Sequence, residues 1–145
     1  MTGPLEALFT AALDQLPEGV ILVDRDERIV YSNRKAQQVR NVKPGDILGK
    51  DVRDCHPAKS TERVERALSH IRKTGDAVFT RMVMDNINEK TYENTYAGLV
   101  DDDGQYLGLL LLTRDATERL EMERARAAYM QTLSNEVSRL SQELH

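Results

Sequence analysis

The sequence predicts an α+β fold in which a five-stranded antiparallel sheet carries helices on one face. An amphipathic helix precedes this core and a long helix follows it. Two short apolar strands, at about 19–24 and 28–32, stand before the central helices, and three longer ones follow, at about 77–85, 91–100 and 105–114. Polar turns between neighbouring strands indicate antiparallel hairpins. A length of 145 residues fits one domain.

Near the N-terminus, apolar residues recur on one face of a helix. They follow the helical spacing of three and four residues: Leu5, Leu8, Phe9, Ala12, Leu13 and Leu16. Thr2 and Pro4 occupy typical start positions, and Pro17-Glu-Gly19 ends the helix. We therefore predict an N-terminal amphipathic helix over residues 1–17, followed by the core over residues 18–115.

The chain between the two groups of strands contains two further predicted helices. Asn33 caps a short helix that runs to about Arg40. Residues 41–57 carry several Pro and Gly residues, which indicates irregular structure. From about Ser60 to Lys73 the sequence predicts a helix that Gly75 ends. Its buried stripe consists of Val64, Ala67, Leu68 and Ile71.

Residues 116–145 are predicted to form a long C-terminal helix. Asp115-Ala-Thr-Glu118 has the pattern of a capping box. Apolar residues farther along alternate spacings of three and four, as a two-stranded coiled-coil seam requires: Met130, Leu133, Val137, Leu140 and Leu144. Upstream, between Leu120 and Leu133, this phase breaks. Two interpretations remain, a dimeric coiled coil, which we favour, and a helix that packs back on its own domain.

Composition argues against several classes of function. The net charge is −4 and no basic stripe stands out, which argues against a nucleic-acid surface. The longest apolar run, Leu107 to Leu112, is too short to span a bilayer, and no signal peptide is evident. The single cysteine, Cys55, forms no internal disulfide, so we expect a cytoplasmic protein. The motifs of common enzyme sites are absent from the sequence, so we predict no enzyme activity.

Three segments carry a family resemblance. Asp24 to Ala36, with the apolar strand before it, and Gly98 to Glu118 resemble the two ends of a PAS sensor domain. The resemblance covers roughly residues 13–118, and it implies a module that holds a small ligand or cofactor and passes its state to a helix. Val52-Arg-Asp-Cys55-His56-Pro57-Ala-Lys59-Ser60 resembles the Cys-His-Pro segment of a PAS subgroup, some of whose relatives bind heme through this histidine.

This resemblance implies heme as the cofactor, with His56 as the iron ligand. Imidazole is a common protein ligand for heme iron, and Pro57 would stiffen the backbone beside it. The rival ligand is His70, because other heme-binding PAS domains take their histidine from the same helix. Helical geometry places His70 on the flank of that helix, near solvent. We prefer His56. The alternative role of His56 is a hydrogen bond to a backbone carbonyl.

Met82 and Met84 are the predicted second iron ligands. They are two residues apart on one strand and so share a face. If this is the concave inner face, a thioether would lie opposite His56, where a diatomic gas could replace it. Methionines on strands are more often core residues than ligands, which is the alternative interpretation.

Asn94, Tyr96 and Gly98 are the other predicted cofactor contacts. They share one face of the next strand, and Gly98 would open space where a cofactor approaches the sheet. Arg81 and Glu93 have the opposite parity in their strands and are expected to face solvent.

These observations leave three functional hypotheses: a heme-dependent gas or redox sensor, a module for another small molecule, and a ligand-free dimerisation scaffold. All three include a homodimer and a downstream signalling protein or output domain. None includes contact with nucleic acid or membrane.

Overall fold

The computed structural model describes residues 3–55, 58–75, 78–86 and 88–144, and its elements confirm the predicted α+β fold. In chain order they are α1 (Pro4–Asp14), β1 (Gly19–Asp24), β2 (Ile29–Ser32), α2 (Arg34–Arg40), α3 (Pro44–Ile47), the 3₁₀ turns η1 (Val52–Cys55) and η2 (Ala58–Ser60), α4 (Thr61–Thr74), β3 (Val78–Asp85), β4 (Lys90–Val100), β5 (Tyr106–Asp115) and α5 (Thr117–Glu143).

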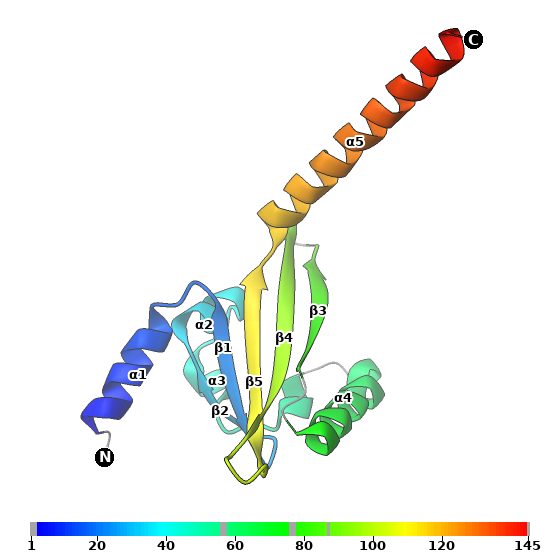
Figure 1. Ribbon diagram of the computed structural model, residues 1–145. Coiled ribbons are helices and arrows are strands. Elements are labelled where there is room, and N and C mark those ends of the chain that lie inside the picture. The colour runs from blue at the N-terminus through cyan, green and yellow to red at the C-terminus, as the bar shows by residue number, and fades with distance from the viewer. Residues whose placement is uncertain (1–2, 56–57, 76–77, 87, 145) are drawn as a thin grey trace.

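The five strands form one antiparallel sheet in the order β2-β1-β5-β4-β3. The last strand, β5, lies in the centre and pairs with β1 from Gly19 opposite Thr113 to Asp24 opposite Gly108. Helices α2, α3 and α4 lie on one face of this sheet, as predicted, and α5 continues from β5 beyond one end of it (Figure 1).

The hydrophobic core lies between the sheet and these helices. Ile21 and Val23 of β1 and Leu109 of β5 point into it, and Leu68 and Ile71 of α4 cover them. Ile71 is only 1% exposed. Each fully buried aliphatic side chain of this size contributes roughly 1.5–3 kcal/mol to folding. The predicted stripe of α4 is therefore the face that packs, and we call the helix-covered side of the sheet its inner face.

Asn33 fixes the geometry at the start of the core. It caps α2, as predicted, by accepting a hydrogen bond at Oδ1 from Ala36 N at 3.0 Å. The same oxygen accepts from Val20 N at 2.8 Å, while Nδ2 donates to the carbonyls of Leu13 and Glu18 at 2.7 and 3.0 Å. One buried amide thus joins the end of α1, the start of β1 and α2.

The two terminal helices contribute nothing to the described core. Neither α1 nor α5 has a buried residue. The seam residues of α5 are exposed, with Leu133 at 42% and Val137 at 66%, so α5 does not pack back on its own domain. Within the described ranges, no helix combines the length and apolar character needed to cross a membrane.

The predicted capping box of α5 is wrong. Ala116 occupies the N-cap and offers no side-chain cap. Asp115 lies one residue earlier and accepts a hydrogen bond from Thr117 N at 2.9 Å, which is an Asx turn. A capping box needs a side-chain acceptor at the N-cap and a Glu or Gln three residues later. Because β5 extends through Asp115, the N-cap is Ala116 and the residue three positions later is Arg119.

Candidate functional site

Asn94, Tyr96 and Gly98 share the inner face of β4. Their partners on β5 are Thr113, Leu111 and Leu109. Asn94 is 8% exposed, and its Oδ1 accepts a hydrogen bond from Thr113 Oγ1 at 2.9 Å. Tyr96 packs against the core cluster. The structure confirms that the three residues share one face of the strand. Their contact with a cofactor stays a prediction.

Gly98 does not open space for a cofactor. A Cβ placed there would lie 1.8 Å from the carbonyl oxygen of Gly75 and 3.0 Å from Cγ2 of Ile71. Gly75 is the residue that ends α4, and its φ of 71° is one that glycine adopts readily. The absence of a side chain at Gly98 thus allows the chain's own backbone to cross the strand closely, which corrects the sequence-based expectation.

Met82 and Met84 lie on the other face of the sheet. The register pairs Met82 with Glu93 and Met84 with Thr91, whereas Arg81 is the residue opposite Asn94. The two methionines are 42% and 61% exposed. They share a face, as predicted, but it is not the inner one, so they lie on the face of the sheet opposite to Asn94 and Gly98. Arg81 has inner-face parity and is nevertheless exposed, because β3 is an edge strand.

His56 and Pro57 lie outside the described residues. Cys55, the last residue of η1, is exposed, and desolvation raises the pKa of its thiol, so the thiol stays protonated at neutral pH. His70 is exposed on α4, as its helical position predicts. In the part of the chain that the structure describes, no group of three or more His, Cys, Asp or Glu residues could hold a metal ion.

A charge network that the sequence did not reveal lies between the β1–β2 turn, η1 and α4. Glu27 is 4% exposed, and its two carboxylate oxygens contact the guanidinium groups of Arg53 and Arg72. Arg53 also pairs with Asp51, at 3.1 Å, and with Glu65. The hydrogen bond to Glu65 is the main cause that raises the pKa of Arg53. The backbone hydrogen bond from Arg53 is the main cause that lowers the pKa of Asp51.

The start of α5 is joined to β4 by polar contacts. Ala116 N donates to Thr91 O at 2.8 Å, and Thr91 N donates to Thr117 Oγ1 at 2.9 Å. An ion pair between Arg119 and Glu93 adds a contact of 2.8 Å. These contacts fix the first turn of the helix to the sheet.

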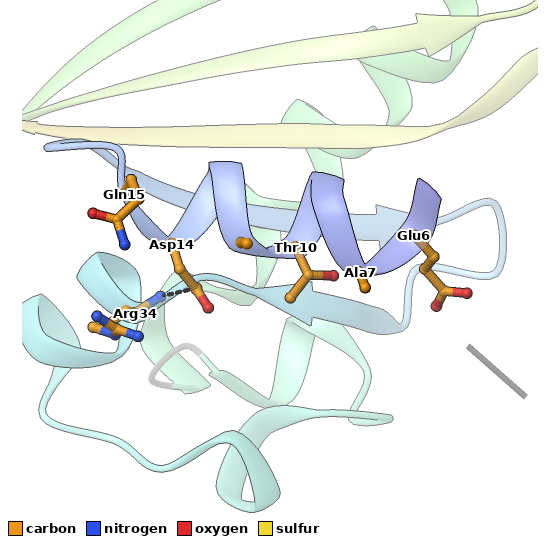
Figure 2. Close-up of a pocket in the computed structure, with 7 residues that line it drawn as sticks. Glu6, Ala7, Thr10, Asp14, Gln15 and Arg34 are labelled. Carbon is orange, nitrogen blue, oxygen red and sulfur yellow. Dashed lines mark hydrogen bonds between the residues drawn. The ribbon is translucent and has the colours of Figure 1, made fainter. Parts of the chain in front are cut away.

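Two open grooves lie outside the inner face. The first lies between α1 and α2 and is lined by Glu6, Ala7, Thr10, Ala11, Asp14, Gln15 and Arg34 (Figure 2). In it, Asp14 Oδ1 accepts a hydrogen bond from Arg34 N at 2.9 Å. The second lies between the β3–β4 turn and α5, with Met84, Lys90 and Leu120 among its walls. Neither groove includes Asn94, Tyr96 or Gly98.

Several solved bacterial structures have similar folds. A C-terminal domain from Streptococcus mutans is 24% identical, with 79% of this chain and 87% of that chain covered and a TM-score of 0.66. The PAS domain of BvgS from Bordetella pertussis is 18% identical, with 90% and 99% covered and a TM-score of 0.64. A sensory box sensor histidine kinase from Vibrio cholerae is 17% identical, with 78% and 92% covered and a TM-score of 0.55.

The match to a family model establishes more about this chain than the similarity to distant structures does. No curated protein sequence matches the chain. At these identities the structural neighbours establish the fold alone. The family model described as PAS fold, however, matches residues 13–121, which include the whole sheet and the first turn of α5. The chain therefore belongs to the PAS fold family, whose domains are typical sensory parts of signalling proteins.

Proposed function

We propose that this chain is a sensory PAS module that pairs with a second copy through α5 and passes a change in its core along that helix to a signalling partner. One observation carries this proposal. The 27-residue helix α5 begins at the sheet and extends away from it (Figure 1). The apolar seam residues of this helix are exposed. The PAS family assignment supports the sensory part, because such domains commonly dimerise and serve output domains.

The seam of α5 has the chemistry that a second copy would cover. Leu133, Val137 and Leu140 are 42%, 66% and 47% exposed and recur at the spacing of a two-stranded coiled coil. Burying each such side chain contributes roughly 1.5–3 kcal/mol, which an isolated helix in water does not obtain. Ion pairs of Arg139 with Glu136 and Glu143 stand beside this seam. An identical helix offers the matching surface.

The joint between sheet and helix supplies the relay. Thr91 and Glu93 of β4 hold Thr117 and Arg119 of α5, and β5 enters α5 directly through Ala116. A shift of the central strands would change the angle or rotation at which two helices meet. Two arrangements that differ by a few kcal/mol are sufficient for such a signal.

The oligomeric state tests this function. We expect the wild-type chain to be a dimer in analytical ultracentrifugation at micromolar concentration. Leu140→Asp should weaken the dimer at least about hundredfold, because two charges would be buried in the seam. Asn135→Asp, on the outer surface of the same helix, is the matched control and should leave the mass unchanged. A monomeric wild type, or a Leu140→Asp variant that dimerises normally, contradicts the proposal.

The described residues do not fit a heme. Gly75 and Ile71 fill the space above Gly98, and Met82 and Met84 lie on the outer face. Heme is therefore not part of the proposed mechanism. What supports heme is the resemblance of Cys55-His56-Pro57 alone. An absorption spectrum of protein produced with added hemin tests it: a sharp heme band lost in His56→Ala and kept in His70→Ala supports ligation by His56. If the protein binds no heme in this experiment, ligation by His56 is excluded.

A further inference from the structure

The turn between β1 and β2 is held by the residue that opens it. Asp24 O accepts a hydrogen bond from Glu27 N at 3.0 Å. Its carboxylate Oδ1 accepts from Asp26 N at 2.9 Å and from Arg28 N at 3.0 Å. Glu27, the fourth residue of the turn, has a φ of 65°, in the left-handed region. The backbone hydrogen bonds thus place Glu27 in a conformation that residues with a side chain rarely adopt.

The turn between β4 and β5 repeats this pattern with a different fourth residue. Asp101 O accepts from Gly104 N at 3.0 Å, and Asp101 Oδ1 accepts from Asp103 N and Gln105 N, both at 2.9 Å. Gly104 has a φ of 79°. Both turns lie at the end of the sheet opposite α5 (Figure 1). Two turns with one hydrogen-bond scheme therefore carry glycine in one case and glutamate in the other.

A glutamate at a glycine-type position has an energetic cost. The left-handed conformation costs a residue with a Cβ about 1–2 kcal/mol, and glycine avoids this cost. The backbone of the turn therefore gives no reason for glutamate. The side chain gives one, because the Glu27 carboxylate is buried between two arginines from other elements.

The Glu27 carboxylate joins two segments that are separate in the sequence. Its Oε2 contacts Nη2 of Arg53, in η1, and its Oε1 contacts Nη2 of Arg72, in α4. Arg53 in turn contacts Glu65, also in α4. Helix α4 is thus connected to the turn directly through Arg72 and indirectly through Glu65.

Helix α4 also makes hydrophobic and backbone contacts with the sheet. Its buried residues are Leu68 and Ile71. At its C-terminal end, Gly75 lies over Gly98. These hydrophobic contacts, with the partly buried Val64, hold the middle and the end of α4, and the ion pairs of Arg72 and Glu65 add a second attachment to the turn and to η1.

We propose that Glu27 is a charge clamp that holds α4 against the sheet, so that α4 can open while the strands stay paired. With the carboxylate present, two guanidinium groups share one buried counter-ion. Without it, Arg53 and Arg72 face each other with less compensating charge, and α4 separates more easily. The clamp makes α4 the movable part of the domain, and a signal that alters the clamp would uncover the inner face of β4.

Amide hydrogen exchange of Glu27→Gly tests the clamp. The turn should tolerate this change because Gly104 occupies the equivalent position of the other turn. We expect amides of α4 to exchange at least about tenfold faster relative to those of β1 and β5, because one partner of a buried charge group is lost. Arg139→Gln, which breaks exposed ion pairs of α5, is the control. It should leave the ratio of the α4 exchange rate to the β1 and β5 exchange rates unchanged.

Glu27→Gln separates charge from shape. It keeps the size of the side chain and removes its charge, so the clamp requires that it also accelerates exchange in α4. Unchanged α4 protection in this variant overturns the proposal. A loss of protection shared equally by α4 and β5 also overturns it, because Glu27 would then stabilise the domain as a whole and no separate opening of α4 would exist.

Discussion

At the scale of single residues, the side chain of Asn33 makes four hydrogen bonds to backbone groups. We predict that Asn33→Ala lowers the free energy of unfolding by about 3 kcal/mol or more, because four backbone groups lose their partner in a site where the side chain is 0% exposed. Urea denaturation measures the change. Asn88→Ala, at an exposed turn, is the control. A loss below about 1 kcal/mol would contradict the prediction.

Gly98 gives a second prediction at this scale. Gly98→Ala places a methyl group against the Gly75 carbonyl, and either α4 or β4 must move. We expect the free energy of unfolding to fall by roughly 2–4 kcal/mol. Thermal unfolding followed by circular dichroism measures it. Gly45→Ala is the matched control, since a Cβ at Gly45 meets nothing within 4 Å, and this variant should unfold like the wild type.

Residue roles were predictable from the sequence where local chemistry decides them. Asn33 stands directly before a helix, and its capping role was predicted because Asn oxygen suits that position. Gly98 was predicted to allow a close approach to the strand, but a glycine alone does not show whether a cofactor or the backbone of the chain approaches it. Glu27 was missed because its burial depends on Arg53 and Arg72, which are distant in sequence. One sequence signal for Glu27 was available: the similar turn that begins at Asp101 has a glycine, Gly104, at the position that Glu27 occupies in its own turn.

At the scale of elements, the joint between β5 and α5 should respond to acid. Hydrogen bonds from Thr117, first through its side chain and then through its backbone N–H, hold the pKa of Asp115 below the usual value of an aspartate. A lowered pKa in the folded state stabilises the joint above the unfolded-state value, and this stabilisation is lost as the pH falls through the folded-state value.

We therefore predict that the first turn of α5 loses amide protection when the pH falls below about 4, the usual pKa range of Asp. Asp115→Asn lacks the titrating group and should show a weaker pH dependence as the pH falls below about 4. Hydrogen exchange with correction for intrinsic pH effects measures both proteins. Equal pH profiles would show that Asp115 does not stabilise the joint.

The limits of the strands were predicted well because side-chain periodicity defines them. The face that a strand turns to the core was predicted poorly where strand pairing defines it. Every strand begins and ends within one residue of its predicted limit. The inner face of β3 was not predictable, because it depends on the register set by the four residues between Asp85 and Lys90. This register places Arg81, and not Met82, opposite Asn94. One residue more or fewer in that turn would exchange the two faces.

At the scale of the whole molecule, the core should fold without the distal part of α5. We predict that removal of residues 125–145 changes the free energy of unfolding of the core by less than about 1 kcal/mol, since this part of α5 buries nothing in the domain. Leu140→Asp in the full chain is the reference, because it should be monomeric. Urea denaturation compares the two. A truncated chain that unfolds without cooperativity would contradict this prediction.

The overall architecture followed from the sequence because strand lengths, turns and helix stripes all agree with one fold. The strand order did not follow, because β1 and β5 pair across more than 80 residues and no local pattern specifies a partner at that distance. The site was only partly predictable for the same reason. Asn94 and Tyr96 share the expected face, but what lies above them is decided by how α4 is held.

The central position of β5 has a mechanical consequence. Gly19 and Thr113 are opposite each other, so the connections to α1 and α5 leave the sheet at the same end. Tension applied between these two helices would open the β1–β5 ladder one rung at a time, from that end inward, and would never load all its rungs together. If the domain is pulled through α1 and α5, it should unfold at low force, beginning at the pairing of β1 with β5.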